Sequence, residues 1–383
     1  MKNFRFIVLA QVLACVFFCA CQKTDQSTDP QKPDPEKKYR TVTRFSEPVK
    51  VFGFQPQHRY AYCPSVIDNG DSTAHVWFCG NPQADKMVDN VYHIVEKADG
   101  THSTPVSVLQ PTPDTWDWCH TCDPSVIEGE FKMGGNSYRY AMFYLGIDTW
   151  DCKGNEVGVA FSNSLDSAVW VKYPDPIVPF TGDHSVYWGE GQASAVSLDK
   201  KGKVLLTYTE GYFITTIKYE ILDMSDMDNI QRGEVKSIPL QGLVMTNGIS
   251  DWANNADFAL NQEQDVITMV RDVHPMSTTY PNFIANRVEV VKMKFSDFLE
   301  GRGRWTQVCY VGKTVSGFPR NHNSALSRDS FGHVADPDHP TIYYTVSGAD
   351  PNVIHPAEWS YCIYKISWAE FQEEITEEDA PSI

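Results

Sequence analysis

The segment DPSVIEGEFKMGGNSYRYAMFYLG, residues 123–146, carries the pattern that decides the fold. It has a polar opening, a short apolar run, a turn with two glycines and an asparagine, and a second run of apolar and aromatic residues. Two strand-like runs joined by such a turn predict an antiparallel hairpin. The same plan recurs in segments that open at Cys63, Asp123, Gln192, Asn255 and His322. We therefore interpret the chain as five repeats of one unit.

The spacing of these openings indicates the architecture. Successive openings are 60, 69, 63 and 67 residues apart. Each hairpin is followed by a third strand-like run, at residues 91–95, 156–161, 215–222, 287–293 and 361–366. Such a period, with about four strands per repeat, is typical of a β-propeller blade. Two β-sandwiches would not produce five copies of one opening. We predict an all-β, five-bladed propeller over residues 41–383, with residues 41–54 as the outer strand of the last blade.

The first 40 residues do not belong to this pattern. Two basic residues precede an apolar run, residues 6–20, which is shorter than the roughly 20 residues needed to cross a bilayer. The run ends before Cys21 in a way that resembles the lipobox of bacterial lipoproteins; the alternative is an ordinary secretory signal. The resemblance implies a signal peptide over residues 1–20, lipidation of Cys21 and a place in the outer membrane, facing the periplasm or the cell exterior. Residues 21–40 are expected to form a disordered spacer.

The charge of the chain excludes some partners. Lys and Arg number 32 against 49 Asp and Glu, which gives a formal net charge of −17. Binding to nucleic acid or to an anionic membrane surface needs a cationic face. We therefore expect no nucleic-acid partner and membrane contact only through the lipid. The chain is also expected to be a monomer. Aromatic residues make up 13% of the chain, which suits a β-rich core or a ligand surface of stacked rings.

The repeat openings are candidates for function because of where a propeller places them. The innermost strand of each blade lines the central channel, and its first residues lie at one end of that channel, here called the mouth. The five opening residues should therefore face one another. The serines that follow them are expected to be structural, because small residues allow the blades to approach the axis. These serines are Ser65, Ser125, Ser194 and Ser324.

Three short motifs, in blade order, resemble the five-bladed glycoside hydrolases of family 43 and their arabinanase and fructosidase relatives. They are Asp123-Pro124-Ser125, Glu190-Gly191 and Asn321-His322-Asn323-Ser324. The resemblance implies that Asp123 orients the sugar and tunes the acid, that Glu190 is the general acid, and that His322 supports the site or a central water or calcium ion. It implies hydrolysis of a glycosidic bond in a polysaccharide or oligosaccharide by carboxylate acid–base chemistry. No other cofactor is expected.

One motif departs from the family. In that family the first blade carries an aspartate that acts as the general base, and in this sequence Cys63 occupies the corresponding position. A thiol does not act as a base unless it ionises, which normally needs an electropositive setting. Either another carboxylate is the base, with Asp257, Asp148 and Glu210 as candidates, or the protein is a non-catalytic glycan-binding propeller.

Further residues are predicted to contact the glycan. Tryptophans that shortly precede inner strands should overhang the mouth and stack on sugars, and Arg320 would bind an acidic sugar or offset Asp123. The predicted substrate-binding set is Cys63, Gln192, Asn255, Asp257, Trp118, Trp188, Trp252 and Arg320.

The cysteines suggest at most a few disulfides. Cys119-His120-Thr121-Cys122 resembles a metal or redox motif, but no second ligand pair follows at zinc-finger spacing, so no metal site is predicted. A disulfide from Cys119 or Cys122 to Cys152 is expected instead. Cysteines on apolar strand-like runs are expected to be buried free thiols, namely Cys79, Cys309 and Cys362.

Overall fold

The computed structural model describes residues 39–53, 60–82, 88–278, 282–347 and 361–374. The predicted signal peptide, Cys21 and nearly all of the predicted spacer lie outside these residues. Strand β1 (Tyr39–Phe45) pairs with β24 (Trp368–Glu374) in a two-stranded sheet. By its contacts the chain divides into a unit of residues 43–371 and a small unit that contains both terminal segments, where Gln372 Nε2 donates to Thr41 Oγ1 over 2.9 Å.

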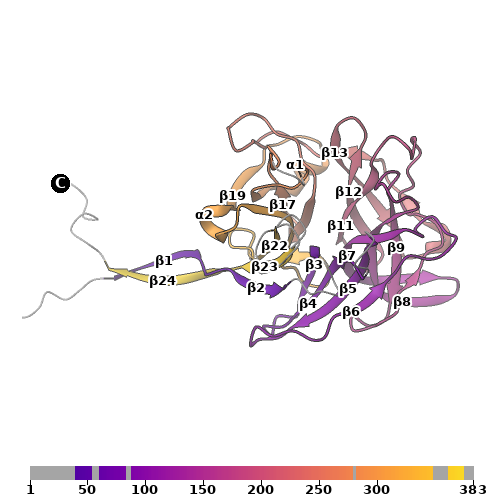
Figure 1. Cartoon of the computed structure of the whole chain (residues 1–383), viewed down its shortest axis with the longest axis horizontal. Helices are drawn as coiled ribbons and strands as arrows, with labels where there is room; N and C mark the ends of the chain where they lie inside the picture. The colour runs from indigo at the N-terminus through magenta and orange to yellow at the C-terminus, as the bar shows by residue number, and fades with distance from the viewer. Residues whose placement is uncertain (1–38, 54–59, 83–87, 279–281, 348–360, 375–383) are drawn as a thin grey trace, which may run out of the picture. The chain divides into compact units, whose positions relative to one another are not determined.

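The larger unit is a five-bladed β-propeller (Figure 1), as predicted. In every blade four strands follow one another from the inside outward. Blades 1 and 2 consist of β3 (Ala61–Asp68), β4 (Ala74–Gly80), β5 (Asn90–Glu96) and β6 (Val106–Leu109), then β7 (His120–Met133), β8 (Asn136–Ile147), β9 (Glu156–Ser162) and β10 (Val171–Lys172).

Blades 3 and 4 carry one extra strand each. They consist of β11 (Gly189–Ser197), β12 (Lys203–Gly211), β13 (Thr215–Asp223), β14 (Gln231–Arg232) and β15 (Lys236–Ser237), then β16 (Ala256–Asn261), β17 (Val266–Asp272), β18 (Val288–Lys294), β19 (Thr306–Val311) and β21 (His333–Val334). Blade 5 consists of β20 (Arg320–Leu326), β22 (Ile342–Ser347), β23 (Cys362–Ile366) and β2 (Val49–Phe52). The short helices are η1 (Met227–Asn229), α1 (Phe295–Leu299) and α2 (Lys313–Ser316).

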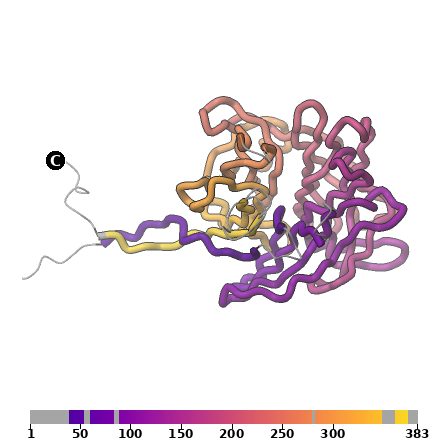
Figure 2. The backbone as a smooth tube through the Cα atoms, viewed as in Figure 1, coloured from indigo at the N-terminus to yellow at the C-terminus, as the bar shows by residue number. Residues whose placement is uncertain are grey.

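The ring is closed by a strand from the other end of the chain. β2 pairs antiparallel with β23, with Val49 opposite Lys365. Figure 2 follows the backbone from indigo to yellow and shows the two ends of the ring meeting there. Val51 and Phe52 are buried in the core between blades 5 and 1. The prediction that residues 41–54 supply the outer strand of the last blade is therefore confirmed for residues 49–52, whereas residues 41–45 belong to β1, which pairs with β24 in a separate sheet.

The hydrophobic core lies between the blades. Each of the five largest clusters joins two neighbouring blades, so that both faces of each sheet are covered. In blade 1, for example, Val76 faces blade 5 while Trp77 faces blade 2. Strands buried on both faces appear in the sequence as continuous apolar runs. Among the described residues, no helix is long and apolar enough to cross a membrane.

The end of the channel opposite the mouth is crossed by residues 327–334, here called the floor segment. After β20 this segment forms backbone hydrogen bonds with the inner strands of the four other blades in turn. The backbone N–H groups of Asp68, Glu128, Ser197 and Leu260 donate to the carbonyl groups of Arg328, Ser330, Phe331 and Gly332 respectively. These bonds satisfy the ends of four inner strands, and the segment ends as β21, which pairs with β16.

A disulfide links Cys79 on β4 to Cys122 on β7, and thus blade 1 to blade 2. This corrects two predictions, because Cys79 is not a free thiol and Cys122 does not pair with Cys152. The sequence could not show that β4 and β7 are neighbours with these two residues at the same height. Cys119 and Cys152 form no disulfide among the described residues, and neither do Cys309 and Cys362, which are buried as expected.

Replacing both Cys79 and Cys122 by Ser is expected to lower the free energy of unfolding by about 2–4 kcal/mol, because the unfolded chain loses a cross-link. The bond closes a loop of 43 residues. Urea unfolding under non-reducing conditions would measure the loss, with Cys152→Ser as the control for an exposed free thiol. Alkylation of Cys79 and Cys122 without prior reduction would contradict the pairing.

Candidate functional site

Near the start of each inner strand lies a residue in a backbone conformation that side chains other than glycine seldom adopt. Positive φ angles of 41–52° occur at Cys63, Asp123, Gln192, Asn255 and Asn323, here called the anchor residues. In four of the inner strands the pairing register shifts at this point, which indicates a β-bulge. Left-handed non-glycine residues are held by their surroundings and tend to cluster at functional sites.

The repeat openings predicted from sequence match these anchors in four blades. In blade 5 the anchor is Asn323, one residue later than the predicted His322. The residue two places after the anchor is a serine in blades 1, 2 and 3. It is Asp257 in blade 4, and in blade 5 it is Ala325, not the Ser324 that the predicted opening implies. Composition alone could not fix this register, because His322 and Asn323 are both polar.

Hydrogen bonds join the anchor residues in a ring round the channel. The Asp123 carboxylate accepts from the N–H of Gln192, and Gln192 Oε1 accepts from the N–H of Asn255 over 3.1 Å. Asp272 completes the next link. Its two oxygens accept from Asn255 Nδ2 over 3.0 Å and from the N–H of Asn323 over 2.9 Å.

The ring closes through Cys63. Asn323 Nδ2 lies 3.5 Å from Cys63 Sγ, and the Cys63 thiol is hydrogen-bonded to the Asp123 side chain. Burial first, and the charge of Asp123 second, raise the pKa of Cys63 well above its usual value. Cys63 is therefore a thiol that donates to Asp123, and this environment does not supply the thiolate that a cysteine base would need.

A cavity of about 750 Å³ opens at the mouth and is lined by residues of all five blades. Its volume is in the usual range for small-ligand sites. Of the predicted site residues, Asp123, Gln192, Asn255 and Trp188 line it. The remaining predicted residues that the structure describes do not line it, namely Cys63, Glu190, Asp257, His322, Trp118, Trp252 and Arg320.

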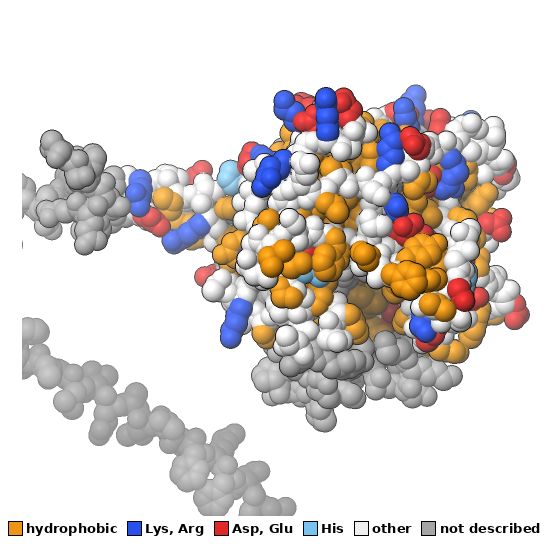
Figure 3. All heavy atoms as spheres, turned by 90° about the horizontal axis from the view of Figure 1, so that it is seen from above, with side chains coloured by type: hydrophobic (Ala, Val, Ile, Leu, Met, Phe, Trp, Pro, Cys, Tyr) orange, Lys and Arg blue, Asp and Glu red, His pale blue; other side chains and the backbone are white. Residues whose placement is uncertain are grey.

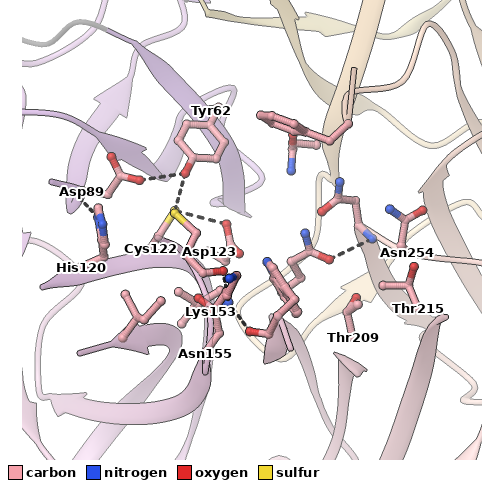
Figure 4. A pocket seen from close by; sticks show the side chains of 18 of the residues that line it. Tyr62, Asp89, His120, Cys122, Asp123, Lys153, Asn155, Thr209, Thr215 and Asn254 are labelled. Atoms are coloured by element: carbon pink, nitrogen blue, oxygen red, sulfur yellow. Dashed lines mark hydrogen bonds between the residues drawn. The ribbon is translucent and has the colours of Figure 1, made fainter. Parts of the chain in front are cut away.

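A second carboxylate, Asp89, lines the same side of the cavity as Asp123 (Figure 4). It accepts hydrogen bonds from the hydroxyl groups of Tyr60 at 2.6 Å and Tyr62 at 2.9 Å. Sequence reasoning missed Asp89. The available signal was its position, because it directly precedes β5, and the third strand of a blade starts at the same end as the first.

The distance between the two carboxylates is limited by a chain of contacts. Tyr62 Oη lies 2.9 Å from Asp89 Oδ2 and 3.0 Å from Cys122 Sγ, and this sulfur lies 3.2 Å from Asp123 Oδ1. The two carboxylates are therefore no farther apart than the upper end of the roughly 6.5–9.5 Å that separates acid and base in inverting glycosidases. Burial is the main cause that raises the pKa of Asp123 to about 6, and the charge of Asp89 adds to it.

His120 is another cavity residue that sequence reasoning did not assign to the site. Its Nδ1 accepts from the N–H of Asp89 over 3.1 Å, which places the ring proton on Nε2. Burial lowers the pKa of His120, so the ring is neutral. Its Nε2 makes no hydrogen bond to the described part of the protein. The Nε2–H is itself buried, so His120 acts in the site by positioning the backbone of Asp89.

Glu190 faces away from the cavity. On β11 and β12, Gly191 lies opposite Thr209, which lines the cavity, and Glu190 lies opposite Glu210. Because neighbouring side chains on a strand point to opposite faces, Glu190 and Glu210 lie on the other face of blade 3. Burial, followed by the charge of Glu210, raises the pKa of Glu190 to about 8.

The other residues predicted as possible bases either form structural hydrogen bonds and ion pairs or do not line the cavity. Asp257 accepts from Ser194 Oγ at 2.7 Å and from the N–H of Leu326 at 2.9 Å, and it forms an ion pair with Arg328 at 3.0 Å. Glu210 forms an ion pair with Lys218 at 3.3 Å. Asp148 does not line the cavity.

His322 is fully buried beneath the mouth. Its Nδ1 lies 2.6 Å from Asn323 Oδ1, and its ring contacts Tyr361, which lines the cavity. Burial lowers the pKa of His322 to about 4, so the imidazole is neutral. Calcium prefers six to eight oxygen ligands. In the described part of the chain no convergent group of three or more His, Cys, Asp or Glu side chains includes His322.

Exposed aromatic side chains stand at the rim of the cavity. Trp188 and Tyr212 line it, and Phe213, on the hairpin between β12 and β13, is 87% exposed. The ring of Tyr187 lies 5.0 Å from the rings of Tyr212 and Phe213. Figure 3 shows a face of the molecule on which hydrophobic side chains gather beside a hollow. Exposed rings of this kind mark ligand-binding surfaces.

The other predicted tryptophans lie outside this cluster. Trp118 is 39% exposed and packs against Trp150 at 5.4 Å, on the hairpin between β8 and β9. Trp252 is half-buried and packs on the ring of His274 at 4.1 Å, just before β16 of blade 4.

The buried carboxyl groups give a prediction for stability. Burial raises the pKa of Asp272 to about 7 and that of Glu190 to about 8, from usual values of 3.8 and 4.5. The folded protein therefore keeps protons that the unfolded chain releases, and its stability should fall as the pH rises from about 4 to about 8. Each unit of separation in pKa corresponds to roughly 1.4 kcal/mol at most.

Urea unfolding at several pH values would measure this fall. Gln cannot ionise, so Glu190→Gln should make the fall with pH shallower. A variant as sensitive to pH as the wild type would contradict the prediction.

The fold and the cavity together define a five-bladed propeller with two carboxylates at its mouth. The chain matches no protein-family model and no curated protein sequence. Among solved structures it is similar to a family 117 glycoside hydrolase of the marine bacterium Zobellia galactanivorans, with a TM-score of 0.56 and 11% identity, over 86% of this chain and 90% of that one.

Two further solved structures have the same fold. An α-L-arabinofuranosidase of Podospora anserina in complex with cellotriose gives a TM-score of 0.53 and 10% identity, over 85% of this chain and 96% of that one. An N-acetylgalactosamine deacetylase of F. plautii in complex with blood group B trisaccharide gives a TM-score of 0.54 and 13% identity, over 85% of this chain and 96% of that one. The propeller fold that the sequence motifs predicted is therefore shared with glycoside hydrolases. Because one neighbour is a deacetylase, the fold alone does not define the reaction.

Proposed function

We propose that this protein binds a glycan in the mouth cavity and hydrolyses a glycosidic bond with Asp123 and Asp89. The observation that carries the proposal is the pair of carboxylates that line one cavity, joined by contacts that keep them no farther apart than the upper end of the separation in inverting glycosidases. The aromatic rim adds support, because sugars present apolar faces that stack on rings such as Trp188 and Tyr212. The structural neighbours that act on glycans agree with this.

The two carboxyl groups have different environments and therefore different roles. Asp123, with its pKa raised to about 6, can hold a proton near neutral pH and donate it to the leaving oxygen. Asp89 is held by two tyrosine hydroxyls and acts as the base that takes a proton from the attacking water. This assignment gives Asp89 the role that the family resemblance left open when Cys63 replaced the usual aspartate.

A non-catalytic glycan-binding propeller is the second candidate. It is favoured by the hydrogen-bonded ring, since Asp123 already accepts from Gln192 and Cys63 and so has a structural role. In this case the cavity and its aromatic rim would bind the sugar without cleaving it.

The two candidates are separated by measuring cleavage and binding on the same samples. Purified protein is incubated with aryl-glycosides and with plant and host polysaccharides, and released sugars are measured; binding is followed by calorimetry. Hydrolysis of at least one substrate is expected. Binding without release in wild type would favour the second candidate, and the absence of both would contradict the proposal.

We also propose that the protein is a lipoprotein anchored through Cys21, as the sequence implies. Replacing Cys21 by Ser should move the protein from the detergent-soluble membrane fraction to the soluble fraction. An unchanged distribution between the fractions would contradict this.

A further inference from the structure

Two buried histidines and an aspartate converge at the contact between blades 1 and 2. His75 Nδ1 lies 2.9 Å from His93 Nε2 and 3.8 Å from Asp166 Oδ1. The three ligand atoms all lie within 4.8 Å of one another. This group is separate from the mouth cavity, whose lining includes none of the three residues.

The scaffold holds the two imidazoles firmly. His75 lies on β4 and His93 on β5, and the ring of Trp77 is stacked against both, with centroids 5.7 and 4.9 Å away. The two histidines are 8% and 5% exposed. Rings fixed in this way lose little freedom when they bind a ligand.

The third group comes from another blade. Asp166 lies in the loop between β9 and β10 of blade 2, and its side chain is 73% exposed. It gives the group an open side through which an ion and water could enter. The histidines belong to blade 1, so an ion held by all three residues would join the two blades.

The donor set indicates which ions would bind. Neutral imidazoles are ligands for Zn²⁺, Cu²⁺ and Ni²⁺, whereas Ca²⁺ and Mg²⁺ prefer oxygen. Two imidazoles, one carboxylate and one water make up a four-coordinate zinc site.

We propose that His75, His93 and Asp166 form a binding site for a divalent transition-metal ion of the Zn²⁺ class that links blade 1 to blade 2. The competing arrangement is a direct hydrogen bond, in which one histidine donates an N–H to the other. In that arrangement one of the two facing nitrogens carries a proton and is not available to a metal.

The test uses the purified protein after treatment with EDTA, under non-reducing conditions that keep the Cys79–Cys122 disulfide intact. Calorimetric titration with Zn²⁺ should give one ion per chain, and the ion should raise the melting temperature by several degrees. Co²⁺ bound in place of Zn²⁺ should give visible absorption without the strong near-ultraviolet band of cobalt–thiolate bonds. No binding of Zn²⁺ would overturn the proposal and leave the direct hydrogen bond as the explanation.

Variants show whether the ion is bound at these residues. His93→Gln should weaken Zn²⁺ binding by at least about tenfold, and so should Asp166→Asn, whose exposed position makes misfolding a minor concern. The matched controls are His339→Gln, an exposed histidine bonded to Asp336, and Cys152→Ser, a free thiol at the cavity. Binding that is lost in Cys152→Ser and kept in Asp166→Asn would overturn the proposal.

Discussion

Replacing Asp123 by Asn is expected to lower the rate of glycan hydrolysis by about 10²–10⁴-fold, the usual contribution of general acid–base catalysis. Asn has the same size and can still accept the hydrogen bond from the N–H of Gln192, so the ring of anchor residues should persist. It has no acidic proton to give to the leaving oxygen. The rate is measured on the best substrate of the screen, and the melting temperature shows that the fold is intact.

Two further variants decide which carboxylate works with Asp123. Asp89→Asn should reduce turnover to a similar extent, because it removes the proposed base. Glu190→Gln separates this assignment from the one that the family resemblance implies, in which Glu190 is the acid. A large loss with Glu190→Gln, together with normal turnover in Asp89→Asn, would contradict the assignment of Asp89.

Replacing Arg328 by Met is expected to destabilise the propeller by about 3–5 kcal/mol, because it leaves a buried carboxylate without its partner. Arg328 is 2% exposed and forms an ion pair with Asp257 at 3.0 Å. Its Nη1 also donates to Phe258 O at 2.7 Å, and its Nη2 lies 3.4 Å from Ser125 Oγ. One side chain thus connects the floor segment to the inner strands of blades 2 and 4.

Urea unfolding would measure this loss, with Arg139→Met as the matched control. Arg139 pairs with Glu128 at the surface and its side chain is 60% exposed, so about 0–1 kcal/mol is expected there. The double variant Arg328→Met with Asp257→Asn should recover part of the loss, because no uncompensated charge remains. A loss for Arg328→Met as small as the control would show that the ion pair contributes little.

The architecture could be predicted because blade repeats are local in sequence. Hairpins, turns and third strands leave patterns within about 70 residues, and the spacing of the openings gave the number of blades. The closing role of β2 followed from the need to complete the last blade. The Cys79–Cys122 disulfide could not be predicted in the same way, because it depends on which residues of neighbouring blades reach the same height.

The site was predicted less completely. Asp123, Gln192 and Asn255 were found because they open a repeat, and all three line the cavity. Asp89 opens a third strand, where the motif comparison had no reason to look. Glu190 was selected by its motif, but strand alternation turns it to the other face of blade 3. A motif therefore located the correct strand end without fixing the direction of the side chain.

The floor segment has a consequence for how molecules reach the cavity. Because residues 327–334 bond to the ends of four inner strands, they obstruct the channel at the end opposite the mouth. Among the described residues, the cavity is therefore closed at this end. Under the proposed function, a glycan would enter and leave through the mouth, and a polymer would lie across the mouth or present one terminus to it.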